Sequence, residues 1–235
     1  MNPTPSPMTG NQPALSKLGD GSTLMSTIYL SVDIEADGPI PGPYSMLSIG
    51  AVAVTIDGRI LGSFSANLAP LPQASQHLET MKFWEKYPEA WEKATKEPLD
   101  PAAAMKDYRK FIDGLPNRPV FMGYPASFDH AFHRWYLIRY TGDDPCGHHA
   151  LDLKTLGASL LKVPYREACK ANFTSRWYNG TSEHYHFALT DAIFQAILGI
   201  NMLREDYNLP KVPCRELQDF IVDSQSQAHI ERNTS

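Results

Sequence analysis

Three β-forming runs near the start of the chain restrict its fold more than any other sequence feature. Residues 28–33, 48–55 and 60–68 are rich in valine, isoleucine and other strand-forming residues. An Asp57-Gly58 pair separates the second run from the third and is a strong hairpin signal. The sequence therefore predicts three antiparallel strands at the beginning of the domain.

Helices and strands alternate along the rest of the chain. Residues 78–94 are typical of a helix interrupted at Pro88, and residues 101–115 of a helix with proline in its first turn. The remaining expected elements are a strand at 119–122, a helix at 127–140, a strand at 150–153, a helix at 154–161 and a long apolar helix at 187–203. This order predicts an α/β fold with a mixed sheet.

The expected domain boundaries follow from composition. With 235 residues the chain suits one domain, which we place at residues 26–205. Residues 1–25 are rich in polar residues and proline, so we expect a disordered leader, and residues 206–235 form a polar tail. No window approaches the roughly 18–20 apolar residues of a membrane span. Without a recognisable signal peptide or CxxC pair, we expect a reducing, cytoplasmic location.

Several carboxylates stand where predicted strands end or helices begin. Asp33 and Glu35 are two residues apart at the end of the first strand, so both should point to one face of the sheet. Asp129 and Asp191 lie in the first turns of two helices. Carboxylates gathered at one edge repel one another unless cations neutralise them, and oxygen ligands suit Mg²⁺ or Mn²⁺. Two such ions form a known clamp for phosphodiester cleavage.

The ordered set of motifs resembles the DnaQ-like exonucleases of the DEDD superfamily. Their Asp-x-Glu motif matches DIE at 33–35, and their Ser/Thr-Phe-Asp motif matches SFD at 127–129. Their third motif, histidine followed five residues later by aspartate, matches HFALTD at 186–191. The other subclass has tyrosine at the position of Phe187, so the chain resembles the histidine (DEDDh) subclass.

This resemblance implies an RNase H-like fold, with helices packed on both faces of a mixed β-sheet. It implies a 3′–5′ exonuclease that hydrolyses single-stranded nucleic acid and releases nucleoside 5′-monophosphates. His186 would act as general base, a task that its ordinary pKa of about 6.5 suits. One departure is Pro125, which stands where the family commonly has asparagine. Two Mg²⁺ or Mn²⁺ ions would be held by four ligands: Asp33, Glu35, Asp129 and Asp191.

Substrate contacts are expected from other segments. Tyr44, Met46 and Leu47 follow the first motif, where family members place apolar residues that wedge or stack terminal bases. The alternative, that Met46 and Leu47 are the buried start of the second strand, remains open. Arg176 lies in a polar segment before His186 and is a candidate for contacting a phosphate or base. Four aromatic residues at helical spacing are expected to pack rather than to form a base platform: Phe83, Trp84, Tyr87 and Trp91.

The net charge of −5 argues against extensive binding to duplex phosphates, so single-stranded 3′ ends fit better. RNA or short oligonucleotides are slightly favoured over DNA for the same reason. Two other functions remain open: a binding module with a degenerate exonuclease fold, and a proofreading exonuclease that acts with a polymerase partner. The degenerate module is disfavoured because all five expected positions are present. A homodimer is also left open.

Overall fold

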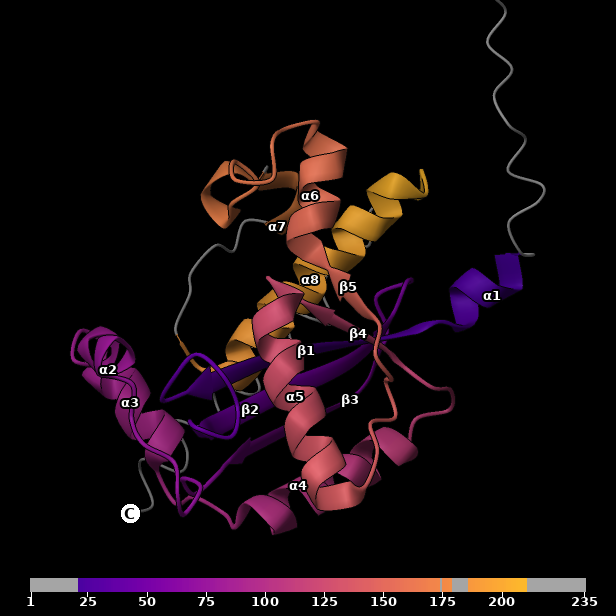
Figure 1. Cartoon of the computed structure of the whole chain (residues 1–235). Coiled ribbons are helices and arrows are strands. Elements are labelled where there is room, and N and C mark those ends of the chain that lie inside the picture. Colours follow the sequence, from indigo (N-terminus) through magenta and orange to yellow (C-terminus); the bar gives the residue numbers. More distant parts are fainter. Residues whose placement is uncertain (1–20, 174, 179–185, 211–235) are drawn as a thin grey trace, which may run out of the picture.

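A computed structural model describes residues 21–173, 175–178 and 186–210 of the chain (Figure 1). Its strands are β1 Ile28–Ala36, β2 Met46–Thr55, β3 Ile60–Asn67, β4 Val120–Gly123 and β5 Ala150–Asp152. They form one sheet in the order β3-β2-β1-β4-β5. The β1–β2 and β2–β3 pairs are antiparallel, whereas β1–β4 and β4–β5 are parallel. The predicted antiparallel start and mixed sheet are therefore confirmed.

The helices of the described part alternate with the later strands. They are α1 Gly21–Ser26, α2 Leu78–Trp84, α3 Pro88–Thr95, α4 Pro101–Asp113, α5 Ala126–Thr141, α6 Leu153–Leu161, the 3₁₀ helix η2 Lys170–Asn172, α7 Ser175–Tyr178 and α8 Ala188–Asp206. As expected, the segment broken at proline forms two helices, α2 and α3. None of the helices described here has the length and apolar character needed to cross a bilayer.

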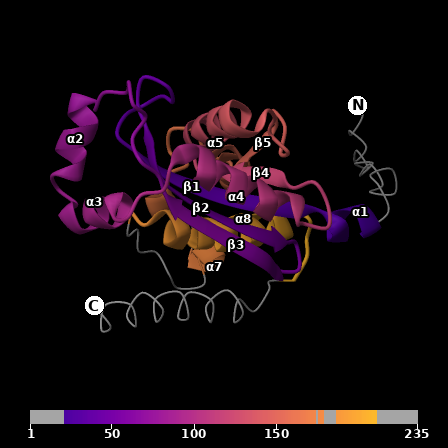
Figure 2. The same ribbon diagram turned by 90° about the horizontal axis from the view of Figure 1, so that it is seen from below.

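Helices cover both faces of the sheet, as the view from below shows (Figure 2). On one face, Leu30 of β1 belongs to the same buried cluster as Tyr108 of α4 and Phe132 of α5. On the other face, Val52 of β2 packs with Ile193 of α8. Alternate residues of a strand point to opposite faces. Because Ser31 Oγ donates to the carbonyl of Ala192 at 2.8 Å, the odd-numbered residues of β1 face α8.

The start of α8 lies directly against β2 at Gly50. A Cβ atom added to Gly50 would lie 2.2 Å from the nitrogen of Leu189 and 2.3 Å from the carbonyl carbon of Ala188. Such a close approach is open only to glycine, which has no side chain. Gly50 is also the cross-strand partner of Asp33. The contact therefore sets the first turn of α8 beside the end of β1.

The short helices α1, η2 and α7 were not anticipated from the sequence. Helices of this length are marginal on their own and depend on tertiary packing. Leu24 of α1, for example, packs against the buried cluster that includes Tyr29 and Leu198. Thus α1 occupies the last residues of the expected leader. Residues 1–20 and 211–235, which hold the rest of that leader and most of the expected tail, lie outside the described residues.

Candidate active site

The end of β1 places two carboxylates on the face covered by α8. Glu35 is 8% exposed, and Asp33 is half-buried. The regular pairing of β1 with β2 is interrupted between Glu35 and Ala36. The strand itself ends at Ala36, one residue after the second carboxylate.

Asp129 reaches the same place from the first turn of α5. Its Oδ1 accepts a hydrogen bond from the backbone nitrogen of Ile34 at 3.2 Å, and its side chain is buried. Asp129 is therefore fixed to the residue that lies between Asp33 and Glu35. This bond joins the second motif to the first.

Pro125, the departure from the family pattern, stands at the N-cap of α5 and supplies no side-chain cap. The Tyr124–Pro125 peptide bond is cis. Asp152, at the end of β5, supplies the missing acceptor: its Oδ2 accepts from the nitrogen of Ala126 at 2.8 Å. A carboxylate at a helix N-terminus also interacts favourably with the helix dipole. The start of α5 is thus held by a strand neighbour instead of its own cap residue.

The third motif approaches from the start of α8. His186 has φ of 54°, in the left-handed region that non-glycine residues rarely adopt. Such a conformation costs about 1–3 kcal/mol and is often found at functional sites. Asp191 is buried in the first turn, where its nitrogen donates to the Phe187 carbonyl at 2.9 Å. Ligand atoms of Glu35, His186 and Asp191 lie within 4.8 Å of one another.

The four carboxylates interact electrostatically. Burial raises the pKa of Asp33 well above its usual range, and the charges of Asp129, Glu35 and Asp191 raise it further. Burial and the charges of Asp191 and Asp129 likewise raise the pKa of Glu35. Burial raises the pKa of Asp129 to about 7, although its bond from Ile34 opposes the shift. Without a cation, the fold therefore favours the protonated form of these three carboxyl groups.

These side chains fit a divalent cation. Four carboxylates offer hard oxygen donors, and a bound cation would relieve the repulsion that raises the pKa values of Asp33 and Glu35. One imidazole lies among them. The donor set matches an oxygen-liganded divalent metal better than a sulfur-rich zinc site.

Lys170, in η2, is a charged neighbour that the sequence did not reveal. Burial lowers the pKa of its ammonium group, while Asp33, Asp191 and Asp129 act in the opposite direction. Its Nζ lies 5.0 Å from the centre of the Tyr124 ring. The positive charge partly offsets the carboxylates. No motif spacing relates Lys170 to them, so no sequence signal could have found it.

Two exposed aromatic rings stand beside His186. The ring of Phe83 lies 5.1 Å and that of Tyr87 4.4 Å from the imidazole. These side chains are 37% and 40% exposed. Packing was expected for all four aromatic residues of this segment. It holds for Trp84, which is buried and donates its Nε1 to the carbonyl of Ala36 at 3.0 Å.

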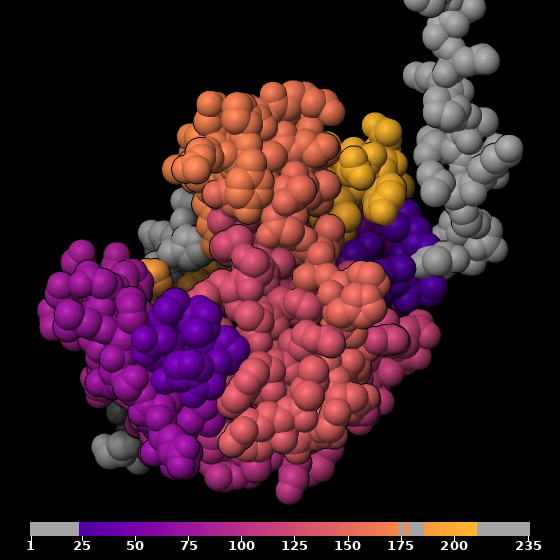
Figure 3. Space-filling model, in the orientation of Figure 1, coloured from indigo at the N-terminus to yellow at the C-terminus, as the bar shows by residue number. Residues whose placement is uncertain are grey.

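The exposed rings belong to a part of the molecule that stands out from its body. The space-filling view shows α2 and α3 projecting at one side of the molecule (Figure 3). Phe83 lies in α2 and Tyr87 directly precedes α3. Both rings are therefore accessible from solvent.

Two of the expected substrate contacts are wrong. Met46 and Leu47 are 0% and 1% exposed, because both begin β2 and point into the packed interior. They leave no surface on which a base could stack. Tyr44 is half-buried, and its ring lies edge-on to His77 at 5.4 Å. Arg176 falls in α7, and its side chain lies outside the described part of the structure.

Comparison with known proteins agrees with the family resemblance of the motifs, although no family profile matches the chain. The chain is 33% identical over 178 residues to the 3′–5′ DNA exonuclease Cap18 of Escherichia coli, covering 73% of this chain and 89% of the relative. Its fold resembles the nuclease domain of 3′hExo, a DEDDh family member bound to rAMP. The TM-score is 0.59 at 11% identity, with 78% of this chain and 94% of that one covered.

A second fold neighbour is the zinc-bound complex of E. coli ExoI with single-stranded DNA. The TM-score is 0.56 at 16% identity, with 83% of this chain and 42% of that one covered. At such identities the two structures show the shared fold, whereas the 33% relative carries the family relationship.

Proposed function

The chain belongs to the DnaQ-like DEDDh family of 3′–5′ exonucleases, and from this premise we propose how it cleaves nucleic acid. The active site we propose consists of four carboxylates and one imidazole: Asp33, Glu35, Asp129, His186 and Asp191. The observation that carries the proposal is their convergence. Glu35, His186 and Asp191 lie with their ligand atoms within 4.8 Å of one another, and Asp129 is bonded to the backbone between the first two carboxylates.

We propose that the four carboxylates hold two Mg²⁺ or Mn²⁺ ions. When bound, these ions supply Lewis-acid stabilisation of the negative charge that develops on the phosphate. The positions of the ligands on the fold favour this role, because β1 is a central strand of the sheet and α5 and α8 pack against the sheet. Asp129 is held by Ile34, and Asp191 by the close packing of α8 on Gly50.

We assign His186 as the general base. Its imidazole accepts the proton of the attacking water as the water oxygen bonds to the terminal phosphorus. The bond from phosphorus to the 3′ oxygen breaks, which releases a nucleoside 5′-monophosphate and a shortened strand whose 3′ oxygen takes up a proton from water to become a free hydroxyl. The left-handed backbone at His186 turns its ring toward Glu35 and Asp191. Lys170, close to three of the carboxylates, is placed to attract the phosphate as it enters.

We propose single-stranded DNA as the substrate. The relative at 33% identity is a DNA exonuclease, and this outweighs the preference for RNA, which rested only on the scarcity of basic residues. Phe83 and Tyr87 present exposed rings beside His186. Such rings bind bases by stacking, with little dependence on sequence, at about 1–3 kcal/mol per base. They would hold the terminal bases while the phosphate enters the site.

The experiment uses 5′-labelled single-stranded DNA and RNA of one sequence, with Mg²⁺, Mn²⁺ or EDTA. The wild type should shorten DNA in a metal-dependent ladder, faster than RNA. Asp129→Asn should abolish the ladder while the protein stays folded. Asp107→Asn, which removes an exposed carboxylate of α4, serves as the matched control and should keep full activity. Wild-type cleavage by Asp129→Asn would disprove the assigned site, and faster cleavage of RNA would disprove the assigned substrate.

A further inference from the structure

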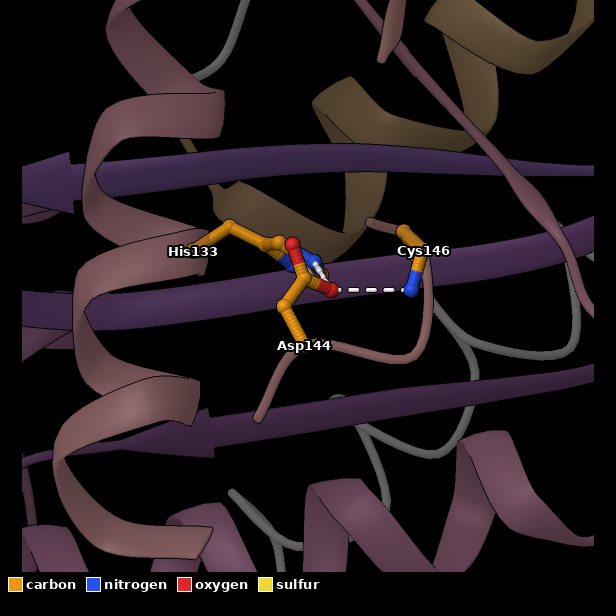
Figure 4. Close-up of side chains that lie close together, drawn as sticks. All are labelled: His133, Asp144 and Cys146. Carbon is orange, nitrogen blue, oxygen red and sulfur yellow. Dashed lines mark hydrogen bonds and ion pairs between the residues drawn. The ribbon is translucent and has the colours of Figure 1, made fainter. Parts of the chain in front are cut away.

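A second group of potential metal ligands lies along α5, separate from the carboxylate site. His133, Asp144 and Cys146 are all buried, and their ligand atoms lie within 4.8 Å of one another. His133 projects from α5 toward Asp144 in the loop that follows the helix, as Figure 4 shows. His130 lies one helical turn before His133, with its Nε2 4.0 Å from Asp144 Oδ2.

Hydrogen bonds explain only part of this cluster. His133 is engaged on both sides, with Nδ1 3.2 Å from the Tyr108 hydroxyl and Nε2 3.3 Å from Asp144 Oδ1. The nitrogen of Cys146 donates to Asp144 Oδ1 at 2.8 Å. In contrast, His130 Nε2 is buried without a hydrogen-bond partner, and Cys146 is a buried free thiol. A buried polar atom without a partner costs about 1–3 kcal/mol, and a cation bound by His130 Nε2 would remove this cost.

The spacing and geometry suit a tetrahedral ion. Histidines three residues apart share one face of a helix, and an aspartate and a cysteine two residues apart face them from the loop. With bonds of about 2.0–2.1 Å, two ligands of a tetrahedral zinc ion lie about 3.3 Å apart. His133 Nε2 and Asp144 Oδ1 are 3.3 Å apart. The ligand atoms of His133, Asp144 and Cys146 lie within 4.8 Å of one another, and His130 Nε2 lies 4.0 Å from Asp144 Oδ2, so side-chain rotations would have to bring the four to the same spacing.

The neighbours of His133 support a ligand role. When its Nδ1 carries the proton, that nitrogen donates to the Tyr108 hydroxyl, and Nε2 presents its lone pair to the cluster. Such an outer hydrogen bond is a regular feature of metal-binding histidines. Arg134 Nη1 now lies 3.5 Å from Asp144 Oδ2. The Arg134 side chain is 38% exposed, so it can turn to solvent when a cation arrives.

We propose that this cluster binds one structural Zn²⁺ ion. Its ligands are two imidazoles, a carboxylate and a thiolate: His130, His133, Asp144 and Cys146. Three of these ligands are buried and His130 is half-buried, and four ligands with nitrogen and sulfur donors are typical of a structural zinc site that has no open position for substrate. Binding releases the thiol proton of Cys146 to solvent. The ion would tie the middle of α5 to the loop that leads into β5. One of its ligands, His130, directly follows Asp129 in the sequence.

The test measures zinc directly. Full-length protein without a polyhistidine tag is produced in zinc-supplemented medium and dialysed. Its zinc content is then measured by inductively coupled plasma mass spectrometry. We expect roughly one zinc per chain in the wild type and almost none in Cys146→Ser. Cys169→Ser, which changes a cysteine outside the cluster, is the matched control and should keep its zinc. Asp191→Asn should also keep its zinc, because it changes only the carboxylate site.

Cobalt substitution identifies the thiolate. Co²⁺-loaded wild type should show a sulfur-to-cobalt charge-transfer band in the near ultraviolet, absent from Cys146→Ser and unchanged in Cys169→Ser. Circular dichroism checks folding, and His130→Gln provides a second variant if Cys146→Ser does not fold. Folded wild type without zinc, or without the cobalt band, would overturn the proposal. Zinc lost from Asp191→Asn but kept by Cys146→Ser would assign the ion to the carboxylate site and overturn it equally.

Discussion

Replacing Gly50 by alanine tests whether the packing of α8 on β2 positions the active site. The new Cβ would meet the nitrogen of Leu189 at 2.2 Å, whereas ordinary contact begins at 3.4 Å. Relief of the clash requires a displacement of about 1.2 Å, and its partners are backbone atoms that cannot rotate away. The start of α8, and Asp191 with it, must therefore move away from β2.

The expected losses of activity and of stability follow from this displacement. A misplacement of about 1 Å at a catalytic group can reduce the rate about 10²-fold. Overpacking in a core typically costs about 1–3 kcal/mol of folding free energy. Gly50→Ala should therefore remain folded with a lower melting temperature and lose about two orders of magnitude in kcat on single-stranded DNA.

The control is Gly114→Ala at the end of α4. Its Cβ would lie 3.4 Å from the nearest atom, the carbonyl oxygen of Lys110, in an ordinary contact far from the carboxylates. It should match the wild type in kcat. If Gly50→Ala also kept wild-type kcat and melting temperature, the start of α8 would not depend on this contact, and the reasoning would fail.

Three further predictions concern the site itself. Burial raises the pKa of Asp129 from its ordinary value to about 7, so the carboxyl group stabilises the metal-free fold below about pH 4 and loses this contribution as pH rises through 7. The melting temperature of EDTA-treated wild type should thus fall from pH 5 to pH 8, and that of Asp129→Asn should fall less steeply. Equal slopes in the two proteins would contradict the raised pKa of Asp129. His186→Asn tolerates the left-handed backbone but removes the base, and should lower kcat by about 10²–10⁴ at unchanged melting temperature. An unaltered kcat would remove His186 from the chemistry. Tyr87→Ala should raise KM for single-stranded DNA severalfold with little change in kcat, whereas Tyr165→Ala, at another exposed tyrosine, should leave KM unchanged. Equal KM values for the two variants would argue against base stacking.

Much of the fold is encoded in local patterns. The strand-forming run from residue 28 and the hairpin signal at Asp57-Gly58 act over a few residues, so they could be interpreted without knowing what packs against them. The carboxylates were predicted from their positions at a strand end and at helix starts, which impose a fixed direction on side chains, whereas His186 was predicted from the resemblance of its motif to the DEDDh family. The chemistry of these residues follows from their side chains alone.

Other features depended on contacts between distant segments. Whether Met46 stacks on a base or lies in the core was decided by the helices that cover β2. Lys170 became part of the site only because η2 folds back toward the carboxylates. His133 and Cys146 meet through the loop after α5. Burial and proximity of this kind arise from the packing of whole elements, which one-dimensional patterns do not record.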